Sequence, residues 1–559
     1  MGRTTTGLFY TAVFGLTPLL GPGCISSGAQ FVPATGVLTV TGTDGPDSFV
    51  VSATANGSIV VNGGIVPISG GVPTVSNTVR IELVGRGGDD QLVIDEFGGS
   101  LPDAVLNGGA GADVLIAGSG NDSVSGGEGD DQIFLGAGDD KVFWSPGDGL
   151  DTIEGQGGFD TLVFTGSDVT ETFDLSANGA RLRLFRDVDA VATDVAGVEA
   201  IELAARGGSD TVVVNDLTGT DVTDVRIDLG ATSGGVDGQA DSIVINATAG
   251  DDAVGIAGDA GAVRVFGLKA DVRVFDAERD QDRLTLNALG GNDVVDATAP
   301  GADGIQLVLN GGLGNDTISG SDGADFVNGG DGNDLVFMGP GDDTFTWNPG
   351  DDSDTVEGQA GVDRLVFNGA NIGEAIDISA NGTRVRFSRN IAAVTTDLNG
   401  VEAIDFRALG GADVITVGDL SGTGVDEVNL ALAGSNGAGD QQVDGVTVLG
   451  TDAADVVEVI GDASGVSVTG LPAQVNVTGM ESASDVLTIG AGAGDDAVSA
   501  SSLKASGPSL TVDGGPDDDV LIGGEGADWL LGGEGDDVLI GGPGQDALDG
   551  GPGNNILIQ

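Results

Sequence analysis

The sequence predicts an all-β solenoid, a parallel β-roll or β-helix in which short strands stack coil upon coil. Three observations predict this class. Nine-residue repeats occur in register in three separate runs, a longer unit recurs in tandem, and strand-type alternation is frequent while no long run of helical period occurs. Glycine accounts for 102 of the 559 residues and aromatic residues for only 4%, which favours a thin repetitive solenoid over a bulky globular core.

The first run covers Gly108 to Phe143 and consists of GGAGADVLI, AGSGNDSVS, GGEGDDQIF and LGAGDDKVF. We number its positions from place one to place nine. Glycine fills places one, two and four, with Ala117 and Leu135 as the two exceptions at place one, aspartate fills place six, and an aliphatic residue fills place eight. Glycine allows the first six residues to form a tight turn, and the last three form a short strand whose middle side chain faces inward. Two turns and two strands, about eighteen residues, then make one coil.

Stacking of such coils brings the aspartates together at the edges. We expect Asp113 to lie above Asp131 on one edge, and Asp122 above Asp140 on the other. Carboxylates at a sheet spacing of about 4.8 Å repel strongly unless a cation lies between them. A flexible site made only of oxygen atoms suits calcium better than magnesium, which needs a small octahedron, or zinc, which prefers nitrogen and sulfur.

The same pattern returns from Gly311 and from Gly514. The first two arrays also continue past a two-residue insertion, Trp144–Ser145 in the first, and end at residues 163 and 366. The aspartates at place six are the candidate metal ligands: Asp113, Asp122, Asp131, Asp140, Asp151, Asp160, Asp316, Asp325, Asp334, Asp343, Asp354, Asp363, Asp519, Asp528, Asp537 and Asp546. A flexible glycine-rich linker is the alternative, but a linker does not keep aspartate and aliphatic residues in phase.

These motifs resemble the hemolysin-type calcium-binding repeat, the RTX nonapeptide family. The resemblance implies a parallel β-roll with Ca²⁺ in its turns, held by the place-six aspartates and by turn carbonyls. The glycines that the resemblance assigns to these metal-binding turns are Gly109, Gly111, Gly127, Gly129, Gly312, Gly314, Gly330, Gly332, Gly524, Gly526, Gly533 and Gly535.

The arrays belong to a longer internal repeat of 203 residues, since 311 − 108 and 514 − 311 both equal 203. We therefore divide the chain into five parts. These are a signal segment (1–23), a partial β-rich segment (24–107), a first sequence repeat (108–310, array 108–163), a second sequence repeat (311–513, array 311–366) and a closing array (514–559).

Several features outside the arrays have plain structural interpretations. The turn at 42–47 and the lone nonapeptide from Gly85 look like isolated calcium turns, and a turn without a stacked partner is expected to be structural. Trp144 and Trp347 are predicted to be packing residues. The arginines of 181–184 and 384–387 alternate with apolar residues, so they share one strand face. We expect them to pair with nearby aspartates, with binding of an acidic glycan as the alternative.

Composition excludes several functions. A net charge of −67 opposes binding to nucleic acid, and without metal it favours an expanded chain. Histidine is absent and Cys24 is the only cysteine, so no internal disulfide, Cys/His zinc site or histidine-dependent triad can form. The chain is predicted not to be an enzyme. A carboxylate-based lyase or hydrolase acting on carbohydrate is the alternative that remains.

The first residues indicate export. Arg3 and the apolar run from Gly7 to Leu20 resemble a signal peptide, and Cys24 resembles the lipidation site of bacterial lipoproteins. No other stretch is apolar enough to cross a membrane. The sequence therefore predicts an extracellular or cell-surface protein that folds on calcium and has a structural or adhesive role. Its predicted partners are calcium ions and surface or matrix components, and it could carry a lipid anchor.

Overall fold

The computed structural model describes residues 28–259, 262–299, 301–437 and 439–559. These residues are 51% strand and 2% helical, which confirms the predicted all-β class. They form two compact units, one ending at Asp237 and one beginning at Gly238. The predicted signal segment and Cys24 lie outside the described residues. None of the helices in the described ranges is long and apolar enough to span a membrane.

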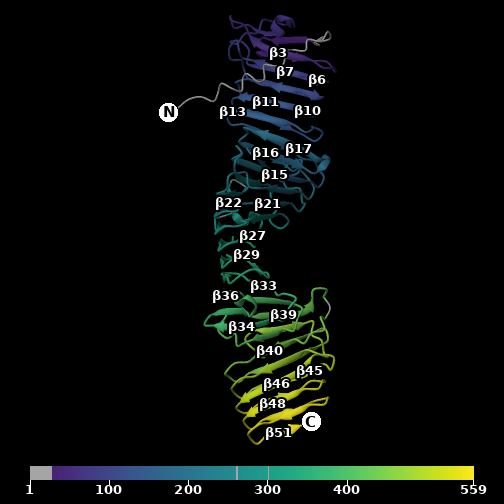
Figure 1. The fold of residues 1–559 in the computed structure, drawn as a ribbon, viewed down its shortest axis with the longest axis vertical. Coiled ribbons are helices and arrows are strands. Elements are labelled where there is room, and N and C mark those ends of the chain that lie inside the picture. The colour runs from purple at the N-terminus through teal and green to yellow at the C-terminus, as the bar shows by residue number, and fades with distance from the viewer. Residues whose placement is uncertain (1–27, 260–261, 300, 438) are drawn as a thin grey trace. The chain divides into compact units, whose positions relative to one another are not determined.

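The first unit contains two ladders of strands that alternate along the chain. The strands β3, β7, β11 and β13 lie one after another along the unit in Figure 1. One ladder contains β1 (Gly28–Val32), β2 (Val37–Thr41), β5 (Ile68–Ser69), β6 (Arg80–Gly87), β8 (Ala104–Ala110), β10 (Ser123–Glu128), β12 (Lys141–Trp144), β14 (Thr161–Thr165), β18 (Ala200–Ala204) and β20 (Asp224–Asp228). The other contains β3 (Ser48–Ala53), β4 (Ile59–Val61), β7 (Gln91–Asp95), β9 (Val114–Ile116), β11 (Gln132–Ala137), β13 (Thr152–Gly157), β15 (Thr172–Asn178), β16 (Arg181–Arg186), β17 (Val191–Ala196) and β19 (Thr211–Val214). Two short 3-10 turns, η1 (Asn62–Gly64) and η2 (Val188–Ala190), complete the unit.

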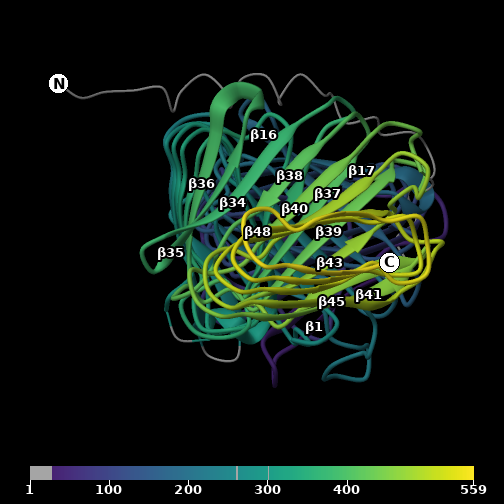
Figure 2. The ribbon, with the colours of Figure 1, turned by 90° about the horizontal axis from the view of Figure 1, so that it is seen from below.

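The second unit repeats this arrangement, and Figure 2 shows its successive coils lying over one another. One ladder contains β22 (Ala253–Asp259), β23 (Ala262–Phe266), β24 (Asp271–Phe275), β26 (Val294–Asp296), β28 (Thr317–Ser319), β30 (Leu335–Phe337), β32 (Thr355–Glu357), β34 (Ala375–Asn381), β35 (Arg384–Arg389), β36 (Val394–Asn399), β38 (Val414–Val417), β40 (Gly445–Leu449), β44 (Val486–Gly490), β46 (Ser509–Pro516), β48 (Trp529–Glu534) and β50 (Ala547–Asp549). The other contains β21 (Ser242–Asn246), β25 (Arg283–Asn287), β27 (Gln306–Leu313), β29 (Phe326–Asp331), β31 (Thr344–Trp347), β33 (Arg364–Asn368), β37 (Ala403–Leu409), β39 (Glu427–Gly434), β41 (Val456–Asp462), β42 (Gly465–Thr469), β43 (Gln474–Thr478), β45 (Ala497–Leu503), β47 (Val520–Ile522), β49 (Val538–Ile540) and β51 (Ile556–Ile558). The 3-10 turns are η3 (Ala302–Gly304) and η4 (Ile391–Ala393).

The aliphatic residues at place eight form the interior, as the sequence predicts. Leu115 pairs with Ile133 in parallel register, and Val124 pairs with Val142. Each of these four side chains is at most 1% exposed. Full burial of such a side chain contributes about 1.5–3 kcal/mol, so the stacked aliphatic columns contribute substantially to the stability of each array.

The two-residue insertion enlarges one coil without breaking the register. Ile133 pairs with Ile153, twenty residues on, whereas Leu115 and Ile133 are eighteen apart. Trp144 is 1% exposed, and its ring stacks on that of Phe164 with centroids 4.0 Å apart. Trp347 is packed in the same way in the second unit. Both tryptophans are therefore packing residues, as predicted.

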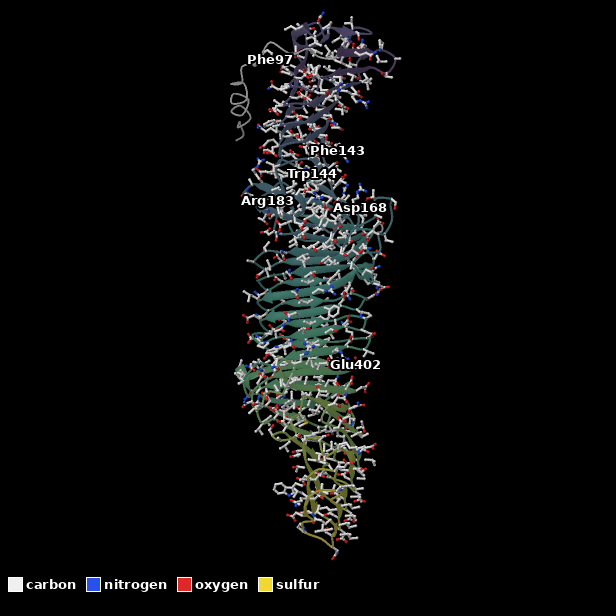
Figure 3. The ribbon with its side chains drawn as sticks, turned by 90° about the vertical axis from the view of Figure 1, so that its right-hand side faces the viewer. Phe97, Phe143, Trp144, Asp168, Arg183 and Glu402 are labelled. Atoms are coloured by element: carbon white, nitrogen blue, oxygen red, sulfur yellow. The ribbon has the colours of Figure 1, made fainter. Side chains whose placement is uncertain are left out.

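Antiparallel strands interrupt the parallel ladders. In the first unit, β16 pairs antiparallel with both β15 and β17, while β13 pairs directly with β17. The outward arginines of β16 bind carboxylates, as expected. Arg181 contacts Glu154 at 2.6 Å and Asp194 at 2.8 Å, and Arg183, 3.9 Å from Asp174, lies on the outside of the unit in Figure 3.

Candidate metal centre

The place-six carboxylates form hydrogen-bonded columns along the edges of the coils. We call these columns aspartate ladders, as distinct from the ladders of strands. The amide of Asp113 donates to Oδ1 of Asp131 at 2.7 Å, and the amide of Asp131 donates to Oδ1 of Asp151 at 2.9 Å. On the other edge, the amide of Asp122 donates to Oδ1 of Asp140 at 2.6 Å. The predicted stacking is thus confirmed, and the fold itself uses one oxygen of each of these carboxylates.

The same ladders occur in the other two arrays. Asp316 donates through its amide to Oδ1 of Asp334 at 2.8 Å, and Asp519 donates to Oδ1 of Asp537 at 3.0 Å. Asn555 continues the last ladder as an acceptor from the amide of Asp537. Fifteen of the sixteen candidate aspartates are buried, with exposures of at most 4%, and Asp546 is half-buried.

The second oxygen of most of these carboxylates has no donor although it is buried. This set of unpartnered Oδ2 atoms comprises Asp113, Asp131, Asp140, Asp160, Asp316, Asp334, Asp343, Asp354, Asp363, Asp519, Asp537 and Asp546. Leaving a buried polar atom unsatisfied costs about 1–3 kcal/mol, and more when the atom is charged. A cation beside Oδ2 would remove that cost, so the carboxylates present fit a metal ion.

Backbone carbonyls converge on the same points. A methyl group built on Gly108 would come within 3.0 Å of both Oδ2 of Asp113 and the carbonyl oxygen of Gly126. The corresponding atoms at Gly311 are Oδ2 of Asp316 and the carbonyl of Gly329. Each glycine thus leaves open a space that is lined by oxygens from two consecutive coils.

The chemistry of the available side chains indicates which metal is bound. Within the described ranges, no group of three or more His, Cys, Asp or Glu side chains could hold a metal ion by itself. The ligands that complete a site must therefore include backbone carbonyls, which the glycine turns supply. Calcium accepts six to eight oxygen ligands in flexible geometry, whereas zinc prefers nitrogen and sulfur.

The turns occur in two states that the sequence did not predict. In an open turn, the place-two residue has left-handed backbone angles, and Oδ2 of the place-six aspartate is unpartnered. All twelve array turns with an unpartnered Oδ2 are open, with place-two φ between 73° and 125°. In a closed turn, the place-two amide donates to that oxygen. Asp122, Asp325 and Asp528 are closed in this way by Gly118, Ser321 and Gly524, at 2.8, 2.6 and 2.6 Å.

The predicted glycines follow this division. Ten of the twelve have left-handed φ angles, from 95° at Gly127 and Gly330 to 156° at Gly535. The exceptions, Gly524 and Gly526, belong to the closed turn of Asp528. Glycine is also required by stacking, because a methyl group on Gly127 would meet the carbonyl oxygen of Gly109.

Burial and mutual repulsion make these carboxylates hard to ionise without a cation. Burial, with a smaller contribution from nearby carboxylates and partly offset by the hydrogen bond from the amide of Asp113, raises the pKa of Asp131 to about 7. The same causes raise the pKa of Asp140 to about 7 and that of Asp151 to about 8. A bound cation would favour the ionised forms and hold the coils together.

One expectation about isolated turns is wrong. The nonapeptide from Gly85 was expected to lack a stacked partner, but the amide of Asp47 donates to Oδ1 of Asp90 and the amide of Asp90 donates to Oδ1 of Asp113, both at 2.7 Å. Strand pairs and loops between these turns lengthen the spacing to 43 and 23 residues, which hides the stacking from a search for an eighteen-residue period. Asp90 was therefore missed as a member of the ladder.

A second feature that the sequence analysis missed is a buried ion pair in each β-rich segment. Glu171 takes the place-six position, and Nε of Arg186 donates to its Oε1 at 2.6 Å. The two side chains are 0% and 2% exposed. Arg389 and Glu374 form the equivalent pair in the second unit. At these turns a guanidinium group supplies the positive charge that a bound cation would supply at the array turns.

Stacked glycine turns with buried carboxylates and unpartnered oxygens define a calcium-binding β-roll. The family model described as RTX calcium-binding nonapeptide repeat (4 copies) matches residues 107–142, 146–163, 310–345, 511–530 and 522–557. These segments are RTX repeats, and Ca²⁺ is the ion that they bind. Comparison with curated proteins found none that matches the chain.

Proposed function

We propose that this chain is an exported structural protein whose β-roll arrays fold and stiffen when they bind calcium. The observation that carries this proposal is the set of twelve array aspartates whose buried Oδ2 atoms lack a donor. We assign the metal to these carboxylates together with the turn carbonyls that face them. Asp151, which lies on the same ladder, joins this set, whereas the closed turns of Asp122, Asp325 and Asp528 already have a donor for Oδ2.

The high negative charge of the chain makes its folding depend on calcium. With a net charge of −67, the chain repels itself when metal is absent, which opposes compaction. Extracellular calcium modules bind with dissociation constants of about 10⁻⁴–10⁻³ M, so such sites stay empty at cytosolic calcium levels and fill outside the cell. Because calcium binds the folded state, filling the sites stabilises the fold by linkage.

The proposed role is structural or adhesive rather than catalytic. Its support is the tandem repetition, the acidity and the use of the buried aspartates in ladders that hold coils together. Surface or matrix components are the proposed partners, and Cys24 is the proposed anchor. A Cys24→Ala variant should be released from the cell surface into the medium. Unchanged retention would remove the anchor from the proposal.

The central test is a calcium titration of the full chain. Circular dichroism should show β structure forming cooperatively as calcium is added after chelation, and native mass spectrometry should count the bound ions. Magnesium at the same concentration serves as the control, since its demand for a small octahedron does not suit carbonyl-rich turns. The same β spectrum in chelator and in calcium, with no bound ions, would overturn the proposal.

A further inference from the structure

We propose that the turns centred on Asp90, Asp293 and Asp496 are additional calcium sites, so that each array begins one coil before its recognisable repeats. This inference rests on the proposed calcium function and extends it to turns outside the segments that match the repeat family. The three aspartates are spaced by 203 residues, since 293 − 90 and 496 − 293 both equal 203.

Each of these aspartates stacks directly on the first aspartate of an array. The amide of Asp90 donates to Oδ1 of Asp113 at 2.7 Å. The amide of Asp293 donates to Oδ1 of Asp316 at 2.7 Å, and that of Asp496 donates to Oδ1 of Asp519 at 2.9 Å. The hydrogen-bonded ladder therefore passes from these turns into the arrays without a change of geometry.

All three turns are in the open state. The Oδ2 atoms of these aspartates are buried and unpartnered, and the residues are 2%, 1% and 1% exposed. The place-two residues, Arg86, Leu289 and Gly492, have φ angles of 85°, 75° and 112°. Left-handed angles are uncommon for arginine and unfavourable for a bulky leucine. The open backbone is thus kept even where the residue does not favour it.

Carbonyl oxygens of these turns face the neighbouring array. Methyl groups built on Gly109 and Gly111 would come within 3.0 Å of the carbonyl oxygens of Arg86 and Gly88. A methyl group on Gly85 would come equally close to Oδ2 of Asp90 and to the carbonyl oxygen of Gly108. The same two kinds of oxygen line the array site at Gly108, so the turn of Asp90 offers a cation the same ligands.

The turns of Asp293 and Asp496 repeat this contact. The carbonyl oxygens of Leu289 and Gly291 lie against Gly312 and Gly314, and the carbonyl of Gly492 lies against Gly515, each closer than a methyl group would allow. Ala288 and Ala491 replace glycine at place one of these turns. A residue other than glycine also occupies place one inside the first array, where Leu135 begins the open turn of Asp140.

The ladders end one coil earlier in turns that need no metal. Thr43 donates to Oδ2 of Asp47 through its amide at 2.6 Å and its hydroxyl at 3.0 Å. Thr248 donates to Oδ2 of Asp252 at 2.9 and 2.8 Å in the same way. Thr451 closes the turn of Asp455 at 2.7 and 3.1 Å. A threonine thus satisfies the oxygen that the next turn leaves unpartnered, and this marks where the metal sites begin.

The test is a count of bound calcium ions in the triple variant Asp90→Asn, Asp293→Asn and Asp496→Asn. Asparagine keeps an oxygen for the ladder but removes the charge that would hold the cation. Native mass spectrometry and equilibrium dialysis at the calcium concentration that just saturates the natural chain should show three fewer ions. The matched control is the triple variant Asp47→Asn, Asp252→Asn and Asp455→Asn. These aspartates lie on the same ladders but in closed turns, so this variant should bind as many calcium ions as the natural chain.

A thermal melt distinguishes aspartates that bind calcium from aspartates that only support the fold. At a limiting calcium concentration the triple variant should melt no lower than the natural chain, whereas its rise in Tm on adding saturating calcium should be smaller. If the triple variant does not fold, the three single variants are counted, and each should lose one ion. An unchanged ion count, or a Tm lowered equally at limiting and at saturating calcium, overturns the inference. A natural chain that binds no calcium would instead refute the proposed function itself.

Discussion

Replacing Gly127 with alanine should disrupt the first array without altering any carboxylate. Gly127 has a φ of 95°, and its added methyl group would meet the carbonyl oxygen, carbonyl carbon and Cα of Gly109. The left-handed conformation costs a non-glycine residue about 1–2 kcal/mol. Because all three contacts are backbone atoms, the coils must also shift apart, and overpacking of this kind costs about 1–3 kcal/mol. We expect a total loss of about 2–5 kcal/mol.

Two glycines of the same unit separate these contributions. Gly179 has a φ of 68°, and a methyl group added there would have no atom within 4 Å, so Gly179→Ala should cost only the conformational part. Gly157 lies in the array with ordinary backbone angles, and a methyl group on it would have its nearest contact at 4.0 Å. Its counterpart 203 residues later is Ala360, so Gly157→Ala should be neutral or should stabilise by about 0.4–1 kcal/mol.

The assay is urea unfolding of the full chain in saturating calcium, combined with amide hydrogen exchange in β10 to β13. Exchange is needed because a solenoid can open locally without unfolding as a whole. The Gly127 variant should also need more calcium to reach its folding midpoint. A Gly127 variant as stable as the Gly179 variant would refute the argument that close stacking of backbone requires glycine there.

Three further outcomes follow from the same structure. The pKa values of Asp131 and Asp140 rise from 3.8 to about 7, so the stability that these groups contribute without metal is fully present below their unfolded pKa and is lost as pH rises through about 7. In chelator, β structure and Tm should therefore be highest at acidic pH and should fall as pH rises from about 4 to about 7, and a flat profile would contradict this. Arg186→Met leaves Glu171 buried and unpaired and should cost about 3–5 kcal/mol in urea unfolding. The control Arg183→Met, at a half-exposed site, should cost at most about 1 kcal/mol, and equal losses would contradict the burial argument. Thr248→Val removes only the hydroxyl that closes the turn of Asp252, so it should lower stability by about 1 kcal/mol and leave the calcium count unchanged.

The nonapeptide pattern predicted much of the site because its period is local and regular. Once the turn and strand lengths are fixed at nine residues, Asp113 must stack on Asp131, and Leu115 must pack beside Ile133. Those features appear at the predicted positions, with the hydrogen bond at 2.7 Å and both aliphatic side chains at most 1% exposed. Calcium followed from the same regularity, since only oxygen ligands recur in the turns.

The partners of Asp90 could not be predicted in this way. Its neighbours on the ladder are 43 and 23 residues away, because strand pairs and loops of unequal length separate the coils. The pairing of Arg186 with Glu171 has the same origin, since β16 returns the arginine to a turn fifteen residues back along the chain. Long-range register of this kind depends on how the antiparallel strands fold back.

By itself, the sequence determined the class of the fold, the inward aliphatic columns and the stacked carboxylates, because each depends on a short period repeated without interruption. Only the tertiary structure decided which carboxylate oxygens have a donor. That choice depends on the backbone angle at place two and on contacts between coils, so Gly109 makes an open turn and Gly118 a closed one although both are glycine. A residue type cannot distinguish these two states, because the direction in which an amide points is set by the coils packed on either side.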